Sequence, residues 1–449
     1  MKLAFLSMKL RIVNFDSHSK SNLQILELSN FQIEPMRIFW FAAILLLPFP
    51  IGFQWLKNNP EQLATSVALR IQKNEVFDAD IKPGAEQLFK YINFIKGKKI
   101  GLVVNQTSTI GNTHLVDSLK SLGVDIRKIF APEHGFRGTA DRGEHVKDDI
   151  DPGTGIKIVS LYGKNLRPGP ELMADLDLVI FDIQDVGVRF YTFTSTMTYM
   201  MESCAQNKVA MLILDRPNPL GHCVDGPVMQ DGYKSFVGLH PVPVIHGLTT
   251  AEYARMINGE GWLKDGLKCE LYHVECLNYN HHKFYKLPIK PSPNLPNMHS
   301  IYLYPSLCLF EGTDVSVGRG TNKQFQVYGH PDFKKGDYSF TPVSMEGAKN
   351  PVLMGQNCKG FDLSTIPIEK LQKNCGFHPE YLINLYQESE ATLKAKFFQN
   401  NDFFNKLVGN ADLKAAVLAG KSEKEIRKGW EKELAAYKEL RKKYLLYAE

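Results

Sequence analysis

Five short apolar runs, each followed directly by polar or charged residues, constrain the fold of this chain more than any other feature. The runs are Lys99–Val104, Ile126–Phe130, Ile156–Leu161, Leu176–Phe181 and Val209–Leu214. Their length and β-branched content predict strands that are buried on both faces. Stretches with a helical pattern lie between them, such as Thr113–Ser121 and Thr194–Asn207. This β–α alternation predicts an α/β fold built on a parallel sheet.

Polar side chains follow every one of these runs. Because the carboxyl ends of parallel strands meet at one edge of a sheet, we expect these side chains to lie on a common rim. The residues expected there are Asn105, Glu133, His134, Tyr162, Asp182, Asp185, Arg189, Asp215 and Arg216. One polar strand end is ordinary, whereas five that converge indicate a site.

Glu133 is the most informative of the rim residues. It stands in the segment Pro-Glu-His-Gly-Phe-Arg-Gly, which ends at Gly138 and brings an acid, the imidazole of His134 and the guanidinium of Arg137 close together. Two glycines in this segment let the backbone bend and approach a ligand. The alternative is a polar turn in which Glu133 caps a helix or pairs with Arg137.

Composition excludes several classes of protein. The chain has 449 residues, of which 44% are hydrophobic and 22% charged, as in a globular protein with sizeable cores. Its formal net charge is only +5, and the basic stretch 421–443 is interleaved with glutamates. Such mixed charge is typical of a solvated helix face. Without a basic patch interleaved with aromatic residues, we expect no binding to nucleic acid.

The strongly apolar tract 37–56 is the principal targeting feature. It begins with Arg37 and about ten apolar residues, which resembles a secretion signal. Because Met36 precedes it directly, we expect residues 1–35 to be an over-extended gene-model segment and residues 36–57 to be a signal peptide or a membrane anchor. The protein is therefore expected to be exported to the periplasm or cell envelope, with membrane anchoring through residues 37–56 as the alternative.

We expect two domains, at residues 84–261 and 262–449. Thr249 and Glu252 form a capping-box pattern that opens a helix. Further helices are expected at Phe377–Gln387, Asn401–Val408, Ala411–Leu418 and Ser422–Tyr447. The loop from Glu311 to Asn322 carries two carboxylates, Arg319 and three glycines, which suits closure over a polar ligand. Its alternative is a tight turn.

Several chemistries lack their sequence signature. No Gly-x-Gly-x-x-Gly follows the first strand, so a dinucleotide, and indeed any cofactor, is not expected. No Gly-x-Ser-x-Gly elbow is present. The seven cysteines have no pairing rhythm and no zinc spacing, so they indicate neither a disulfide framework nor a structural metal site. A hard-cation site made by Asp182, Asp185 and His134 is an alternative, although an aspartate that opens a turn does not require a metal.

Acid–base chemistry by carboxylates remains. Aromatic residues accompany the acidic strand ends, and they suit stacking on sugar rings. They are Phe136, Phe190, Tyr191, Phe193 and Tyr199.

Several longer motifs resemble those of the exo-β-N-acetylmuramidases, glycoside hydrolase family 171, formerly a bacterial domain of unknown function. The motifs begin at Asn105 (Asn-Gln-Thr), Pro132 (Pro-Glu-His-Gly-Phe-Arg-Gly), Asp182 (Asp-Ile-Gln-Asp-Val-Gly-Val-Arg-Phe-Tyr-Thr), Asp215 (Asp-Arg-Pro-Asn-Pro) and Glu311 (Glu-Gly-Thr-Asp-Val-Ser-Val-Gly-Arg-Gly-Thr). The resemblance runs from about Ala85 to the C-terminus. It implies a Rossmann-like parallel-sheet domain plus a second α/β domain, with the active site in the cleft between them.

The resemblance also implies an activity. The family releases terminal N-acetylmuramic acid from the non-reducing ends of peptidoglycan fragments, so the expected substrate is an oligosaccharide such as MurNAc-GlcNAc. A non-catalytic muropeptide-binding protein and a metal-dependent hydrolase are the rival readings.

Roles for individual residues follow from matching positions in these motifs. Glu133 is expected to be the general acid or acid/base, and the wider catalytic set is Glu133, His134, Asp185 and Glu311. The second carboxylate stays open among Asp182, Asp185 and Glu311, and the substrate N-acetyl group could replace it. Substrate binding is expected from Asn105, Arg137, Asp182, Arg189, Tyr191 and Arg319, with no metal. Arg319 and Arg189 are the candidates for reading the lactyl carboxylate that distinguishes muramic acid from glucosamine.

Overall fold

The computed structural model describes residues 77–449, except 79, 134, 137–148, 164–165 and 399–400. The described residues all belong to one compact unit, residues 75–449. The predicted segments 1–35 and 36–57, like His134 and Arg137, therefore lie outside the described residues. Among the helices of the described part, none is both long and apolar enough to cross a membrane.

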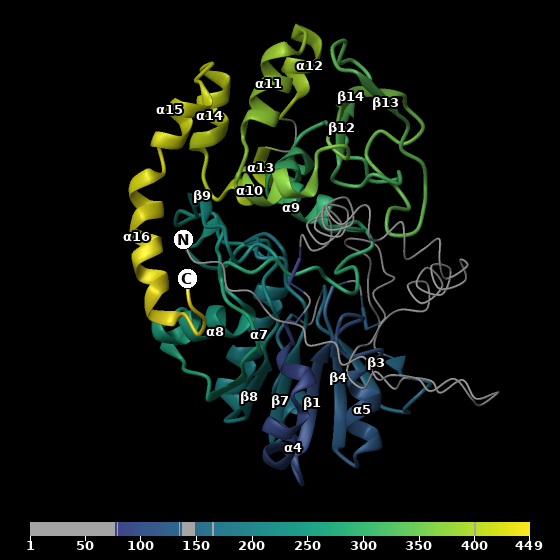
Figure 1. Cartoon of the computed structure of the whole chain (residues 1–449), viewed down its shortest axis with the longest axis vertical. Helices are drawn as coiled ribbons and strands as arrows, with labels where there is room; N and C mark the ends of the chain where they lie inside the picture. Colours follow the sequence, from purple (N-terminus) through teal and green to yellow (C-terminus); the bar gives the residue numbers. More distant parts are fainter. Residues whose placement is uncertain (1–76, 79, 134, 137–148, 164–165, 399–400) are drawn as a thin grey trace, which may run out of the picture. The chain divides into compact units, whose positions relative to one another are not determined.

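A seven-stranded sheet forms the core of the first part of this unit, with the strand order β11-β8-β7-β1-β4-β6-β5. Figure 1 shows β8, β7, β1 and β4 side by side. Every neighbouring pair is parallel except β5 and β6, which are antiparallel. The strands are β1 (Lys99–Val104), β4 (Asp125–Ala131), β5 (Asp149–Ile150), β6 (Lys157–Ser160), β7 (Leu178–Asp182), β8 (Ala210–Leu214) and β11 (Leu271–Val274). The prediction of an α/β fold on a parallel sheet is confirmed.

Both faces of this sheet are buried, as the continuous apolar runs predict. In β1, Ile100, Leu102 and Val104 enter one apolar cluster, and Val103 enters the other. The first cluster includes residues of α4 (Leu88–Ile95) and α5 (Leu115–Ser121), and the second includes residues of α7 (Phe193–Asn207) and α8 (Thr250–Gly259). Because side chains alternate along a strand, this period of two gives each face its own layer of helices.

The order of the strands creates a crevice at one edge of the sheet. From β1 the chain passes to β4 and β6 on one side, and then to β7, β8 and β11 on the other side. The direction of winding therefore reverses at β1. In open α/β sheets, ligands bind outside the carboxyl ends of the strands at such a reversal. The loops that follow β1, β4 and β7 border this place.

The C-terminal part combines a small sheet with many helices. Its antiparallel sheet has the order β12-β14-β13. The elements are β12 (Val327–His330), β13 (Tyr338–Phe340), β14 (Cys358–Asp362), α9 (Met298–Leu307), η3 (Cys308–Gly312), α10 (Ile368–Lys373), α11 (Glu380–Glu388), α12 (Ala391–Lys396), α13 (Asn401–Val408), α14 (Asp412–Leu418), α15 (Glu423–Lys428) and α16 (Glu431–Arg441). The helical segment expected over Ser422–Tyr447 is present as two helices, α15 and α16, because the backbone leaves helical geometry at Trp430, where φ is −122°.

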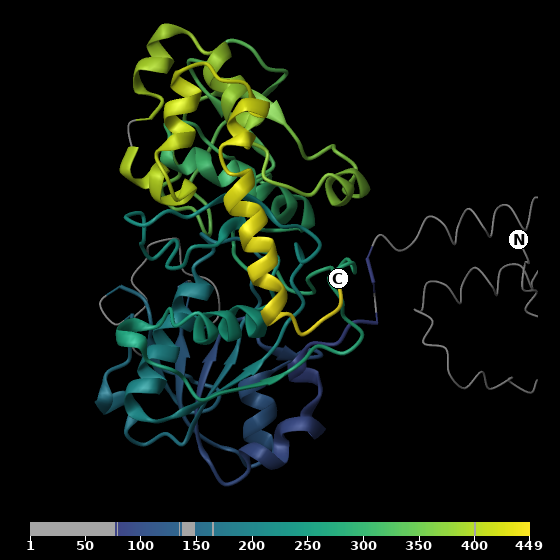
Figure 2. The same cartoon turned by 90° about the vertical axis from the view of Figure 1, so that its left-hand side faces the viewer.

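Helix α16 brings the end of the chain back to the first part. The Tyr437 hydroxyl donates a hydrogen bond to the His246 carbonyl oxygen over 2.7 Å, and Arg441 donates to the Gly247 carbonyl oxygen. Figure 2 shows this helix in yellow. The short elements that remain are η1 (Gly84–Glu86), β2 (Thr109–Ile110), β3 (Thr113–His114), α6 (Pro170–Met173), β9 (Asp225–Val228), β10 (Pro243–Ile245), η2 (Lys264–Gly266) and η4 (Lys442–Tyr444).

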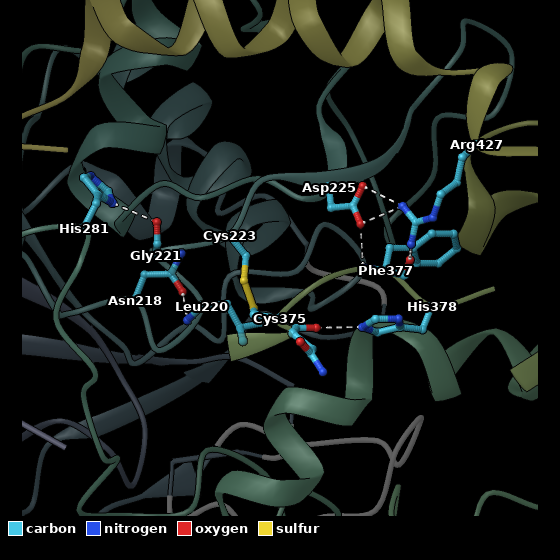
Figure 3. The surroundings of a disulfide bond; sticks show 11 residues. Asn218, Leu220, Gly221, Cys223, Asp225, His281, Cys375, Phe377, His378 and Arg427 are labelled. Atoms are coloured by element: carbon cyan, nitrogen blue, oxygen red, sulfur yellow. Dashed lines mark hydrogen bonds and ion pairs between the residues drawn. A yellow bond between two sulfur atoms is a disulfide. The ribbon is translucent and has the colours of Figure 1, made fainter. Parts of the chain in front are cut away.

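A disulfide bond joins Cys223 to Cys375, 152 residues apart in sequence (Figure 3). Close to it, Asp225 accepts a hydrogen bond from the Phe377 amide over 2.9 Å and pairs with Arg427. The reading of the cysteines as a set without a disulfide was therefore wrong for this pair, because sequence spacing carries no signal for partners so far apart. The other five cysteines are buried, as expected of apolar packing residues.

Candidate active site

A cavity of about 270 Å³ lies at the crevice that the strand order predicts. One part of its wall comes from the loops after β4 and β6, and from the segment before α7. The other part comes from the segment after β11, from α9, η3 and α13, and from the loop before β12. The segment between β9 and β10 completes the wall. The lining residues are Glu133, Tyr162, Phe190, Tyr191, Thr192, Phe193, Phe236, Val237, Ser292, Asn294, Leu295, Tyr304, Cys308, Glu311, Arg319, Phe325, Phe403 and Leu407.

Glu133 lines this active-site cavity just beyond the end of β4. It lies in a turn after the strand, and in this turn the Gly135 amide donates a hydrogen bond to the Pro132 carbonyl oxygen over 2.9 Å. Gly135 has a φ of +78°, a conformation that favours glycine. The Glu133 side chain is buried, and its Oε2 accepts a hydrogen bond from the Thr192 hydroxyl over 2.7 Å. The carboxylate is therefore both shielded from bulk water and held in one orientation.

Aromatic rings supply much of the remaining wall. Tyr191 is buried and its hydroxyl donates to the Pro291 carbonyl oxygen over 2.9 Å. Burial, together with the negative charges of Asp185 and Glu133, raises the pKa of Tyr191 well above its ordinary value, so its hydroxyl stays protonated. Rings around a polar cavity suit the apolar faces of a sugar, because they offer flat contact area without hydrogen-bonding demands.

Glu311 and Arg319 contribute the charged groups of the C-terminal part. The Arg319 Nε donates to Oε1 of Glu311 over 2.5 Å, and the guanidinium lies 4.9 Å from the Phe325 ring centroid. Phe325 has a φ of +52°, an unusual conformation for a residue with a side chain. The two terminal nitrogens of Arg319 make no hydrogen bond to any residue that the structure describes. This guanidinium can therefore pair with Glu311 and still offer donors to the cavity.

Asp185 follows β7, but it does not line the cavity. Its Oδ1 accepts a hydrogen bond from the Gly187 amide over 2.6 Å and lies 3.8 Å from Nε2 of His246. A Cβ at Gly187 would meet the Asn218 side chain at 2.3 Å, so this turn requires glycine. Oδ2 of Asp185 is buried without a hydrogen-bond partner among the described residues. Its catalytic role stays a prediction that the cavity geometry does not support directly.

Asp182 and Asn105 are buried below the rim. Asp182 accepts hydrogen bonds from Arg216 at 2.6 and 2.9 Å, and both side chains are almost fully buried. The Asn105 side-chain oxygen accepts from the amide and the hydroxyl of Thr107, at 2.9 and 2.6 Å. Neither residue lines the cavity. In this structure both hold the strand ends in place, and contact with substrate stays a prediction for each.

Arg189 is also buried away from the cavity wall. Its guanidinium donates four hydrogen bonds, to the carbonyl oxygens of Pro227, Val242, Leu407 and Val408, at 2.6 to 3.0 Å. Burial lowers the pKa of Arg189 to about 10, still well above neutrality. The structure thus gives this arginine a role in joining β9, β10 and the end of α13. Of the two arginines expected to read a lactyl carboxylate, only Arg319 lines the cavity.

Sequence reasoning missed several polar or aromatic residues of the wall, among them Thr192, Phe236 and Asn294. Thr192 stands in the Phe-Tyr-Thr end of a quoted motif, which was its available signal. Asn294 is buried and its amide donates to the Gly347 carbonyl oxygen over 2.7 Å. No local pattern distinguishes it or Phe236 from ordinary loop residues. His134 and Arg137 lie outside the described residues.

One group of potential metal ligands occurs within the part of the chain that the structure describes. It consists of His222, Cys223 and Cys375, whose ligand atoms lie within 4.8 Å of one another. The two sulfur atoms are bonded to each other, so they are not available to an ion. The alternative cation site at Asp182, Asp185 and His134 lies partly outside the described residues, because His134 is not among them. Within it, Asp182 is paired with Arg216.

Comparisons with known proteins match most of the chain to one family. Residues 100–299 match the family model "Exo-beta-N-acetylmuramidase NamZ, N-terminal", and residues 302–447 match "Exo-beta-N-acetylmuramidase NamZ, C-terminal". The peptidoglycan beta-N-acetylmuramidase NamZ of Bacillus subtilis (strain 168) is 35% identical over 379 residues, which cover 80% of this chain and 89% of that protein.

Two crystal structures of DUF1343 family proteins from Bacteroides fragilis NCTC 9343 are similar to this one. The first is 44% identical with a TM-score of 0.76, and the match covers 83% of this chain and all of that chain. The second is 26% identical with a TM-score of 0.69, and it covers 82% of this chain and all of that chain.

Proposed function

We propose an activity on the basis of family, since the chain belongs to the exo-β-N-acetylmuramidase NamZ family. The protein hydrolyses terminal, non-reducing β-1,4-linked N-acetylmuramic acid from peptidoglycan fragments. Membership of this family makes the protein a glycoside hydrolase. The relative from Bacillus subtilis is named as a peptidoglycan beta-N-acetylmuramidase. A role in cell-wall turnover and recycling, with a fragment such as MurNAc-GlcNAc as substrate, is part of the proposal.

One observation carries the proposal, namely a buried carboxyl group in a cavity walled by aromatic rings. Glu133 lines the cavity and is 8% exposed. Glycoside hydrolysis requires an acid that protonates the leaving oxygen. The hydrogen bond from Thr192 holds the carboxyl group in one orientation at the cavity wall, as proton transfer to a bound sugar requires.

Arg319 is proposed to recognise the lactyl carboxylate of muramic acid. A planar guanidinium matches a carboxylate through two parallel hydrogen bonds. Nε of Arg319 donates to Glu311, while its two terminal nitrogens donate to no residue that the structure describes. Because Arg319 lines the cavity that also contains Glu133, a single sugar could contact both.

Glu311 is the better supported candidate for the second carboxylate. It lines the same cavity as Glu133, whereas Asp185 and Asp182 do not. Its ion pair with Arg319 holds the carboxylate at the cavity wall, where a nucleophile or a base for water has to lie. Direct participation by the substrate N-acetyl group remains the alternative.

We also propose that the protein is exported. The disulfide between Cys223 and Cys375 supports this, because such bonds form and persist in oxidising compartments. The apolar tract 37–56 supports it as well at the level of sequence. Whether this tract is cleaved or serves as an anchor is decided by N-terminal sequencing of the mature protein.

The test is release of a chromophore from an aryl N-acetyl-β-muraminide, compared with the matching N-acetyl-β-glucosaminide. We expect turnover of the first, with a strong preference over the second. Tight binding of muropeptides without any release at high protein concentration would instead identify a binding protein. Activity that disappears on exhaustive chelation and returns with a divalent cation would identify a metal-dependent hydrolase.

A further inference from the structure

A second cavity adjoins the active-site cavity. It measures about 360 Å³ and shares Ser292 with the first one. Gln106, Asn322 and Gln324 contribute side-chain amides to its wall. A third cavity, of about 230 Å³, adjoins the first at Glu311 and Arg319. Two cavities therefore adjoin the active-site cavity. The second cavity includes Gln106, which follows a strand of the large sheet, and the third is formed by the C-terminal part alone.

The register of the large sheet indicates which of the two adjoining cavities lies on the same side as Glu133. Strands β1 and β4 are parallel neighbours in which Val103 pairs with Phe130. Gln106 follows Val103 by three residues, as Glu133 follows Phe130, so the two occupy equivalent positions on adjacent strand ends. The second cavity includes Gln106, whereas the third is lined only by residues 311–352. A general acid must reach the glycosidic oxygen, so the leaving sugar has to lie on the side of Glu133.

The lining of the second cavity suits a neutral sugar. The Gln106 amide nitrogen donates to the carbonyl oxygens of Lys290 and Pro291, at 3.3 and 3.0 Å. Its side-chain oxygen is buried and has no hydrogen-bond partner among the described residues. Such an acceptor is costly until a donor reaches it. Sugar hydroxyl groups and an acetamido N–H are donors of the required kind.

Two further amides are available in the same wall. The side chains of Asn322 and Gln324 make no hydrogen bond to another residue that the structure describes. Each amide offers both donors and an acceptor, which matches the mixed groups of a 2-acetamido sugar. The third cavity is lined by residues 311–352 alone, among them the charged groups of Glu311 and Arg319. The second cavity, which carries three side-chain amides on the side of the acid, is therefore the better site for the leaving sugar.

We propose that the second cavity binds the sugar on the reducing side of the scissile bond, a 2-acetamido-glucopyranoside, through Gln106, Asn322 and Gln324. This inference rests on the proposed function, since it presumes that Glu133 protonates the bond between the two sugars. Binding energy at this leaving-sugar cavity contributes to catalysis only when the leaving group is a sugar with hydrogen-bonding groups.

The experiment compares two substrates in the full-length protein. One is the disaccharide MurNAc-GlcNAc, and the other is an aryl N-acetyl-β-muraminide, which lacks the second sugar. We expect Asn322→Ala together with Gln324→Ala to lower kcat/KM about 10–100-fold on the disaccharide, because two hydrogen bonds are lost. On the aryl substrate the same variant should stay within about twofold of wild type.

Gln356→Ala is the matched control, because Gln356 is an exposed amide of the same part that lines none of these cavities. Asn322→Ala alone, at an exposed position, should show a smaller loss of the same kind and guards against misfolding of the double variant. Equal losses on both substrates, or no loss on either, would overturn the assignment of this cavity. A wild-type protein that releases muramic acid from neither substrate would instead refute the proposed function.

Discussion

The hydroxyl of Thr192 donates a hydrogen bond to Oε2 of Glu133 over 2.7 Å, and so links the segment before α7 to the loop after β4. Both residues line the active-site cavity. A hydrogen bond to a charged group contributes about 1.5–3 kcal/mol. The contact therefore restrains the carboxyl group in one orientation within the cavity.

The first prediction concerns the carboxyl group itself. Glu133→Gln keeps the shape of the side chain and can still accept the hydrogen bond from Thr192, but it cannot donate a proton as an acid. Turnover of an aryl N-acetyl-β-muraminide should fall by about 10²–10⁴-fold. Circular dichroism should show an unchanged fold. A folded variant that retains more than half of wild-type turnover would end the assignment.

The second prediction concerns Thr192. Thr192→Val removes the hydroxyl at nearly constant volume, so the Glu133 carboxyl group loses the donor that orients it. If this orientation serves proton transfer, kcat should fall by about tenfold, since about 1.4 kcal/mol corresponds to a factor of about ten in rate. Thr192→Ser, which keeps the hydroxyl, should resemble wild type. The same kcat in all three folded proteins would show that the contact does not assist catalysis.

The third prediction separates Glu311 from Asp185. Glu311→Gln should lower kcat by about 10²–10⁴-fold if Glu311 acts as nucleophile or base. Asp185→Asn should cost far less activity, because Asp185 lies outside the cavity wall and its neutral counterpart can still accept from the Gly187 amide. Rates of both variants on the aryl substrate decide the matter. The reverse order of losses would favour Asp185.

The fourth prediction tests recognition of muramic acid. Arg319→Ala should lower kcat/KM on an aryl muraminide by about 10–100-fold, since a charge-assisted contact of about 1.5–3 kcal/mol is lost. Activity on the matching glucosaminide should fall less, because only the lost pairing with Glu311, and no lactyl contact, affects that substrate. Arg319→Lys should recover part of the loss, because it keeps the charge without the planar fork. An unchanged preference between the two substrates would assign the lactyl group to other residues.

Much of the sheet could be predicted from local pattern, because a strand buried on both faces must be apolar throughout. The run Lys99–Val104 matches β1 at both ends, and the capping box at Thr249 and Glu252 opens α8 as expected. The position of Glu133 at the cavity followed from the same reasoning, since parallel strands must end on one rim. These are consequences of short-range sequence.

The burial of Arg189 and Asp182 could not be predicted in the same way. The carbonyl oxygens that Arg189 contacts come from four positions, two of them in α13, more than two hundred residues away. Asp182, at the end of β7, accepts a hydrogen bond from Arg216, which follows the neighbouring strand β8. Whether a polar strand-end residue faces the ligand or supports the backbone depends on partners that lie far away in sequence.

The fifth prediction concerns the disulfide between Cys223 and Cys375. Reduction should lower the melting temperature, because a native disulfide typically contributes about 2–5 kcal/mol to folding stability. Thiol labelling of the unfolded, unreduced protein should modify five of the seven cysteines, and all seven after reduction. The double variant Cys223→Ser and Cys375→Ser should melt at the temperature of the reduced protein. Complete labelling without reductant would show that the bond is absent.

The last prediction follows from Asp215, which is fully buried at the end of β8. Burial raises the pKa of Asp215 to about 7, although hydrogen bonds from the Tyr447 hydroxyl and the Ala251 amide, at 2.6 and 2.9 Å, oppose the increase. An unfolded aspartate has a pKa near 3.9. Between these values the folded state binds the proton more strongly than the unfolded state. Stability from this residue is therefore fully present below about pH 4 and is lost as the pH rises towards 7.

Asp215→Asn should remove this part of the pH dependence, because an amide keeps the shape of the neutral acid without titrating. Melting temperatures of wild type and variant, measured from pH 4 to pH 8, should differ most at the upper end, where the wild-type carboxyl group is forced to ionise in a buried place. Tyr447→Phe serves as a second variant, since it removes a hydrogen bond that favours the ionised form. It should steepen the loss of stability with rising pH. Parallel curves for wild type and Asp215→Asn over this range would show that Asp215 does not titrate in the folded protein as its burial requires.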